Sequence, residues 1–186
     1  MSTKLKIAAA VAAAVLLSAC SSPKHEPMPL VKFTPSMEVT EVWSKGLSSA
    51  EGFLVPAVYD DMVFAAGGKT LTRLNARTGE TEWSVSFNSP ITGGVGSDGY
   101  VTAVGLWDGN LEVVDAEGKV SWEKKLTTEL ASPPVVSHGL VIARTMDTRV
   151  SAFEASSGEL QWTYQRSQPA LTVRLPTRML AHDNFL

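Results

Sequence analysis

Short apolar runs separated by turn residues fill the chain from about residue 50 onward. Runs such as Val150–Phe153 have the period of two that indicates β-strands, and the density of turn glycines argues against helices. Three turn signals recur at similar places, at Asp60–Asp61, Asp98–Gly99 and His138–Gly139. Asp-Gly between β-rich runs is a strong hairpin signal because both central positions favour positive φ. The pattern therefore predicts an all-β chain of short antiparallel strands.

Tryptophans recur along the chain at a nearly constant spacing. Trp43, Trp83, Trp122 and Trp162 lie 40, 39 and 40 residues apart, and the last three each close a Gly-x-x-x-Trp unit that follows an apolar-x-Ala step. Repeats of about 40 residues with four short strands are typical of β-propeller blades. We predict that these four tryptophans are structural wedges between blades, because an indole offers a large apolar surface and one N–H donor.

The repeats divide residues 39–186 into a partial propeller. We expect blades near residues 50–87, 91–126 and 130–166, the start of a fourth from 176, and third-blade strands near 132–137, 140–145, 149–154 and 159–165. About three blades leave the ring incomplete, since single-chain propellers use about 4 to 8. We therefore interpret the chain as the N-terminal part of a longer protein; a short propeller that assembles from several chains is the alternative. Glu38–Gly46 is predicted to be the outer strand of a final blade.

The first 38 residues have the pattern of a targeting sequence followed by a tether. Residues 1–19 form a signal peptide, because a basic start precedes 13 apolar or small residues, too few for the roughly 20 of a membrane span. Leu17–Cys20 resembles the lipobox of bacterial lipoproteins, which implies acylation of Cys20; Ser21 favours the outer membrane. The alternative is a soluble periplasmic protein whose cysteine falls there by chance. Residues 20–38 are a Pro-rich tether.

Composition and charge narrow the possible functions. A net charge of −3 over 186 residues argues against nucleic-acid binding, and the single cysteine excludes an internal disulfide framework. Gly94–Gly99 matches a dinucleotide fingerprint, but a strand rather than a helix is predicted to follow it. We expect no catalytic residues, no metal site and no cofactor. Trp107, off the tryptophan register, is a candidate for an exposed aromatic platform.

The mature chain resembles the BamB family of outer membrane protein assembly factors over its whole length. The specific matches are Ile91–Val95 and Ala131–Val136, which each open a blade, and Pro169–Pro176 in the connection after the third blade. The resemblance implies a non-enzymatic scaffold, lipid-anchored at the periplasmic face of the outer membrane. It would bind the periplasmic POTRA domains of BamA and aid the insertion of unfolded β-barrel clients. In this family the last connection carries the dock for BamA, which here implies partner-binding by Leu171, Val173 and Arg174. Val173 is shorter than the leucine that the family favours.

Two other interpretations remain. Leu171 and Val173 could pack beneath their loop, with Arg174 solvated. The Ala-x-x-x-Gly-x-x-x-Trp rhythm is also similar to the repeat of quinoprotein dehydrogenases, which bind pyrroloquinoline quinone and a metal ion. Those enzymes need further ligands and a vicinal disulfide or an equivalent stacking group, and the chain has no second cysteine.

Overall fold

The computed structural model describes residues 27–30, 36–48, 54–167 and 178–182. It divides the chain into two compact units, Met1–Val39 and Thr40–Leu186. In the first unit, the described residues form no strand and are exposed. No helix in the described part of the chain is long and apolar enough to span a membrane.

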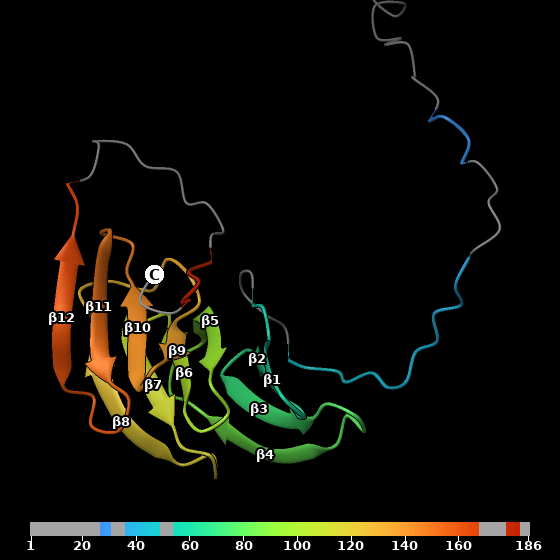
Figure 1. Ribbon diagram of the computed structural model, residues 1–186, viewed down its shortest axis with the longest axis horizontal. Helices are drawn as coiled ribbons and strands as arrows, with labels where there is room; N and C mark the ends of the chain where they lie inside the picture. Colours follow the sequence, from blue (N-terminus) through green and yellow to red (C-terminus); the bar gives the residue numbers. More distant parts are fainter. Residues whose placement is uncertain (1–26, 31–35, 49–53, 168–177, 183–186) are drawn as a thin grey trace, which may run out of the picture. The chain divides into compact units, whose positions relative to one another are not determined.

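The second unit contains three four-stranded antiparallel sheets, each built from strands consecutive in sequence (Figure 1). The first sheet contains β1 (Ala57–Tyr59), β2 (Met62–Gly67), β3 (Thr70–Asn75) and β4 (Thr81–Ser86). The second contains β5 (Ile91–Ser97), β6 (Thr102–Leu106), β7 (Asn110–Val114) and β8 (Val120–Lys125). The third contains β9 (Val135–Ser137), β10 (Leu140–Arg144), β11 (Arg149–Glu154) and β12 (Leu160–Gln165). These sheets confirm the prediction of an all-β propeller fold, one sheet per blade.

The core lies between successive sheets. Because side chains alternate between the two faces of a strand, the second sheet contributes to two apolar layers. Val104 packs with Phe64 and Leu71 of the first sheet, whereas Ala103 packs with Val141 of the third. Burial on both faces explains the near-continuous apolar sequence of the middle strands. The fourth strand of each blade lies at an edge and is largely exposed.

The hairpins follow the turn signals of the sequence. Gly99 and Gly139 have φ of 89° and 73°, and Asp60 and His138 reach 50° and 51° without being glycine. The segment with the dinucleotide-like glycines is β5 followed by a turn and β6, paired antiparallel, so no helix follows it. The glycines belong to a blade hairpin.

The first strand of the third blade is shorter than expected. β9 begins at Val135, although the sequence predicts a strand from 132. Pro133 and Pro134 have no N–H to donate to a ladder, so regular pairing starts only after them.

The predicted strand at Glu38–Gly46 is not formed. Residues 38–48 have no strand conformation in the described chain. A fourth blade strand needs a third strand beside it, and the sheet pairings offer none to this segment. It packs on the first sheet instead, where a Cβ on Gly67 would lie 2.6 Å from the carbonyl oxygen of Ser48. Of the start of the expected fourth blade, only residues 178–182 are described, and they contain a single bridge residue, His182.

Candidate functional site

Three of the four repeat tryptophans make the same contact. The Nε1–H of Trp43 donates to the carbonyl oxygen of Ala76 at 2.9 Å. Trp83 donates in the same way to Ala116 at 2.9 Å, and Trp122 to Ala155 at 2.8 Å. Each acceptor is the alanine of the apolar-x-Ala step in the repeat that follows in sequence. For Trp83 and Trp122, the indole N–H is thus satisfied across a boundary between two sheets.

A glycine makes room for each of these indoles. Gly79, Gly118 and Gly158 have φ of 72°, 81° and 70°. A Cβ at these glycines would lie only 2.6 to 2.7 Å from the rings of Trp43, Trp83 and Trp122 respectively. The glycine is therefore needed both for its backbone conformation and for the close approach of the ring. The glycine of one repeat receives the tryptophan of the preceding repeat, which explains why the two recur together.

Trp162 lies in a different environment. Its side chain is 39% exposed, and it makes no comparable hydrogen bond with any described residue. Tyr164, two residues after it on β12, is 60% exposed. The described part of the chain therefore leaves this face of the third sheet uncovered.

A pair of acids occupies the second sheet where its neighbours have hydroxyls. Glu112 on β7 lies opposite Glu123 on β8. The same cross-strand position holds Thr72 with Ser84 in the first sheet, and Ser151 with Thr163 in the third, hydrogen-bonded at 3.0 and 3.2 Å. Burial, together with the nearby charges of Glu123 and Asp108 and a hydrogen bond with Glu123, raises the pKa of Glu112 to about 7.

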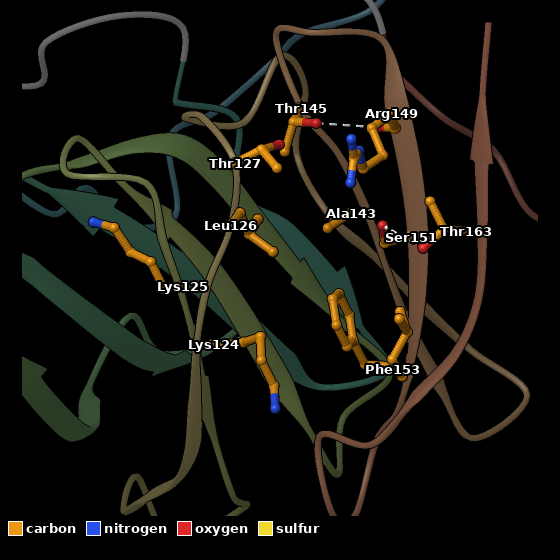
Figure 2. A pocket seen from close by; sticks show the side chains of 11 residues that line it. Lys124, Lys125, Leu126, Thr127, Ala143, Thr145, Arg149, Ser151, Phe153 and Thr163 are labelled. Carbon is orange, nitrogen blue, oxygen red and sulfur yellow. Dashed lines mark hydrogen bonds between the residues drawn. The ribbon is translucent and has the colours of Figure 1, made fainter.

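A groove of about 220 Å³ separates β8 from the third sheet (Figure 2). Its apolar floor includes Phe153, Leu126 and Ala143. Arg149 extends into it from β11, and Lys124 lies at the Phe153 end. The groove therefore combines an apolar floor with two cations.

A carboxylate of the chain itself, that of Asp147, lies beside the Arg149 end of the groove. Asp147 accepts hydrogen bonds from Thr127, at 2.9 Å, and from Thr145, and its Oδ2 is 3.8 Å from Nε of Arg149. Burial alone would raise the pKa of Asp147, but these hydrogen bonds and the arginine outweigh it and lower the pKa below its ordinary value. Asp147 therefore stays ionised, yet Nε of Arg149 has no hydrogen-bond acceptor.

Several residues singled out in the sequence lie outside the described residues. These are Cys20 and the three residues of the expected dock, Leu171, Val173 and Arg174. Trp107 is described, and it is 59% exposed beside the β6–β7 turn. Among the described residues, no three of the His, Cys, Asp and Glu side chains form a cluster that could hold a metal ion.

The groove was not predicted from the sequence, although a signal for it exists. Lys124 follows Trp122 by two residues, at the place where Val85 follows Trp83. A cation at the position that Val85 fills in the first blade marks a boundary between sheets that is packed differently.

Comparison with known proteins gives one consistent family. The family model described as outer membrane protein assembly factor BamB matches residues 40–90 and 67–186. The BamB of Burkholderia pseudomallei is 37% identical over 92% of this chain and 46% of its own length. The BamB of Bordetella pertussis is 32% identical over 91% of this chain and 46% of its own length. The chain thus spans about half the length of these relatives.

Solved structures agree with the sequence matches. The crystal structure of BamB from Moraxella catarrhalis superposes with a TM-score of 0.58 at 27% identity, covering 65% of this chain and 37% of that one. A europium-containing methanol dehydrogenase gives 0.58 at 15% identity over 69% of this chain and 27% of its own, a likeness of fold alone. Sequence and fold together assign the chain to the BamB family of outer membrane protein assembly factors.

Proposed function

We propose that this chain serves the assembly of outer membrane β-barrel proteins as a scaffold that binds partners and catalyses no reaction. The observation that carries the proposal is family membership across most of the chain, with 37% identity to a BamB over 92% of its residues. Cys20 carries the lipid anchor that holds the chain at the periplasmic face of the outer membrane. Several acyl chains anchor a protein stably because each buried methylene contributes about 0.8 kcal/mol.

The partner-binding segment in this proposal is residues 171–174. Leu171 and Val173 point the same way in an extended chain, and Arg174 adds a planar guanidinium that can bind a carboxylate with two hydrogen bonds. Apolar anchors beside an arginine are the composition of interface hot spots. We assign this segment to the POTRA domains of BamA.

A binding measurement with purified proteins tests the dock. Arg174→Glu in the chain from residue 21 onward is expected to weaken binding to the BamA POTRA domains at least about tenfold, because it replaces a hot-spot cation with an anion. The melting temperature should not change, since the proposal gives Arg174 no structural role.

Arg77→Glu is the matched control. It makes the same charge reversal on the β3–β4 turn, where Arg77 forms an exposed ion pair with Asp61 at 3.2 Å. Exposed pairs of this kind contribute at most about 1 kcal/mol, so this variant should bind and fold as the wild type does. Equal binding by Arg174→Glu and wild type, or a loss of binding accompanied by an equal loss of stability, would refute the dock.

The lipid anchor has its own test. Cys20→Ser should abolish acylation of the mature chain, measured by mass spectrometry after expression with its signal sequence, and should release the protein into the soluble periplasmic fraction. Membrane retention of the unacylated variant would exclude Cys20 as the anchor.

A further inference from the structure

The two boundaries between sheets are filled differently at equivalent positions. Between the first and second sheets, the residues two and four places after Trp83, Val85 and Phe87, pack against the buried cluster that includes Leu106. Between the second and third sheets, Lys124 stands at the place of Val85 and Thr145 at that of Leu106. Both replacements exchange branched apolar side chains for polar ones. The groove of about 220 Å³ lies at this second boundary.

The groove holds cationic donors with unused capacity. Nε of Arg149 is buried without a hydrogen-bond acceptor. Leaving a buried donor unpaired is unfavourable, more so for a charged group, and an incoming acceptor would recover this free energy. Lys124 makes no hydrogen bond or ion pair with the described residues. Asp147 supplies one negative charge at the Arg149 end and does not reach hydrogen-bond distance of Nε.

We propose that this groove is a docking site for an extended acidic segment of a partner protein, with one apolar side chain between two carboxylates. The apolar side chain enters against Phe153 and Leu126, and the carboxylates bind Arg149 and Lys124. The proposal goes beyond the dock of residues 171–174 and does not depend on it.

The dimensions of the groove fit such a segment. A cavity of about 150 Å³ holds a benzene molecule, so about 220 Å³ takes one leucine-sized side chain with room to spare. Arg149 and Phe153 are four residues apart on β11, which is about 13 Å of strand. Lys124 lies at the Phe153 end (Figure 2). An extended peptide with acids at positions i and i+4 and an apolar residue at i+2 matches this spacing on one face.

The charge of residues 168–177, which follow β12 in the sequence, argues against this segment of the chain as the occupant of the groove. Residues 168–177 contain one charged residue, Arg174, and no Asp or Glu. Such a segment cannot supply the carboxylates, whereas an acidic segment of another protein can.

The test uses the peptide acetyl-Ser-Glu-Val-Leu-Val-Glu-Ser-amide and the chain from residue 21 onward, measured by titration calorimetry. We expect a dissociation constant below about 1 mM at low salt, weakening several-fold at about 0.5 M salt because the contacts are ionic. A peptide with lysine in place of both glutamates should not bind. Absence of binding by the acidic peptide, or equal binding by the lysine peptide, would overturn the proposal.

Groove-filling variants locate the binding. Lys124→Val restores the apolar residue of the first boundary and should weaken binding at least about tenfold without lowering the melting temperature. Arg149→Gln should weaken it several-fold. Lys119→Val is the matched control. It makes the same change from lysine to valine on the exposed β7–β8 turn and should bind the peptide as the wild type does.

Three further results would count against the proposal. The first is unchanged peptide binding by Lys124→Val, and the second is displacement of the peptide by acetate alone at similar concentration. The third is self-association of the chain that Lys124→Val abolishes, which would assign the groove to a second copy. POTRA binding by these variants is a separate readout, so failure here leaves the dock of residues 171–174 standing, and failure of the dock leaves the groove standing.

Discussion

At the scale of single residues, the fold depends on a tryptophan of one blade and a glycine of the next. The indole of Trp122 covers Gly158, packs at 6.0 Å from the ring of Phe153 and donates to Ala155. Trp162 occupies the same repeat position but is 39% exposed in the described chain. The two residues therefore differ in their surroundings and not in their place in the repeat.

Trp122→Ala is expected to destabilise the chain by about 3–5 kcal/mol, because it removes a large side chain from the boundary between two sheets. Trp162→Ala should cost less than about 1 kcal/mol, since its ring is partly solvated and spans no boundary with a described sheet. Urea denaturation of both variants measures the difference. Similar losses of stability in the two variants would contradict the wedge role of Trp122.

The acid pair in the second sheet predicts a pH-dependent stability. Glu112 is buried opposite Glu123, and its pKa is raised from 4.5 to about 7. The folded state therefore binds this proton more tightly than the unfolded state does. Its stabilising effect is complete below about pH 4.5 and is lost as the pH rises through 7, so stability should fall across this interval by about 2 kcal/mol from this group.

Glu112→Gln keeps the shape of the side chain and removes its titration. The free energy of unfolding, followed from pH 4.5 to 7.5, should lose most of its downward slope in this variant. Thr72 and Ser84, at the same position in the first sheet, have no charge to titrate. A slope that persists in Glu112→Gln would place its origin in other groups.

At the scale of elements, the innermost strands of neighbouring blades approach closely. A Cβ on Gly96 of β5 would lie 2.1 Å from the carbonyl oxygen of Pro134, just before β9. Because the obstructing oxygen belongs to the backbone, it cannot rotate away as the end of a flexible side chain could. The second and third blades therefore meet only because β5 has a glycine at this point.

Gly96→Ala should destabilise the chain by about 1–3 kcal/mol, because β5 and β9 must separate to admit the methyl group. Gly46→Ala is the matched control, since a Cβ there meets nothing within 4 Å. Thermal unfolding of the two variants gives the comparison. A melting temperature of Gly96→Ala equal to that of Gly46→Ala would mean that the two strands can move apart without cost.

The blade strands could be predicted from the sequence because their signals are local. Hairpin residues and the Gly-x-x-x-Trp unit fix where strands begin and end, and β11 lies at residues 149–154, where the sequence places it. Pairing that depends on distant partners could not be predicted. Glu38–Gly46 has the composition of a strand, but it forms none because no third strand lies beside it.

The candidate sites could be predicted less well than the fold. The groove depends on what Lys124 and Thr145 leave unfilled between two sheets, and such a volume is not visible in a linear pattern. The burial of Glu112 likewise depends on the face that β7 turns toward the first sheet. Leu171, Val173 and Arg174 were identified through resemblance to a family, and they lie outside the described residues.

At the scale of the whole molecule, the chain belongs to a family of assembly factors whose members are about twice as long. It covers 46% of the relatives from Burkholderia and Bordetella. Its described residues form three blades, and Trp83 and Trp122 link each of the first two to the next. In our account the chain works by binding, with residues 171–174 as its contact to BamA.

Site-specific photo-crosslinking in cells tests this central claim most directly. A benzophenone amino acid replaces Leu171 in the chain, with Lys119 substituted in parallel as the control position on the exposed β7–β8 turn. Our account predicts a crosslink from position 171 to BamA and none from position 119. Crosslinks from position 171 to proteins other than BamA, or equal yields from both positions, would contradict it.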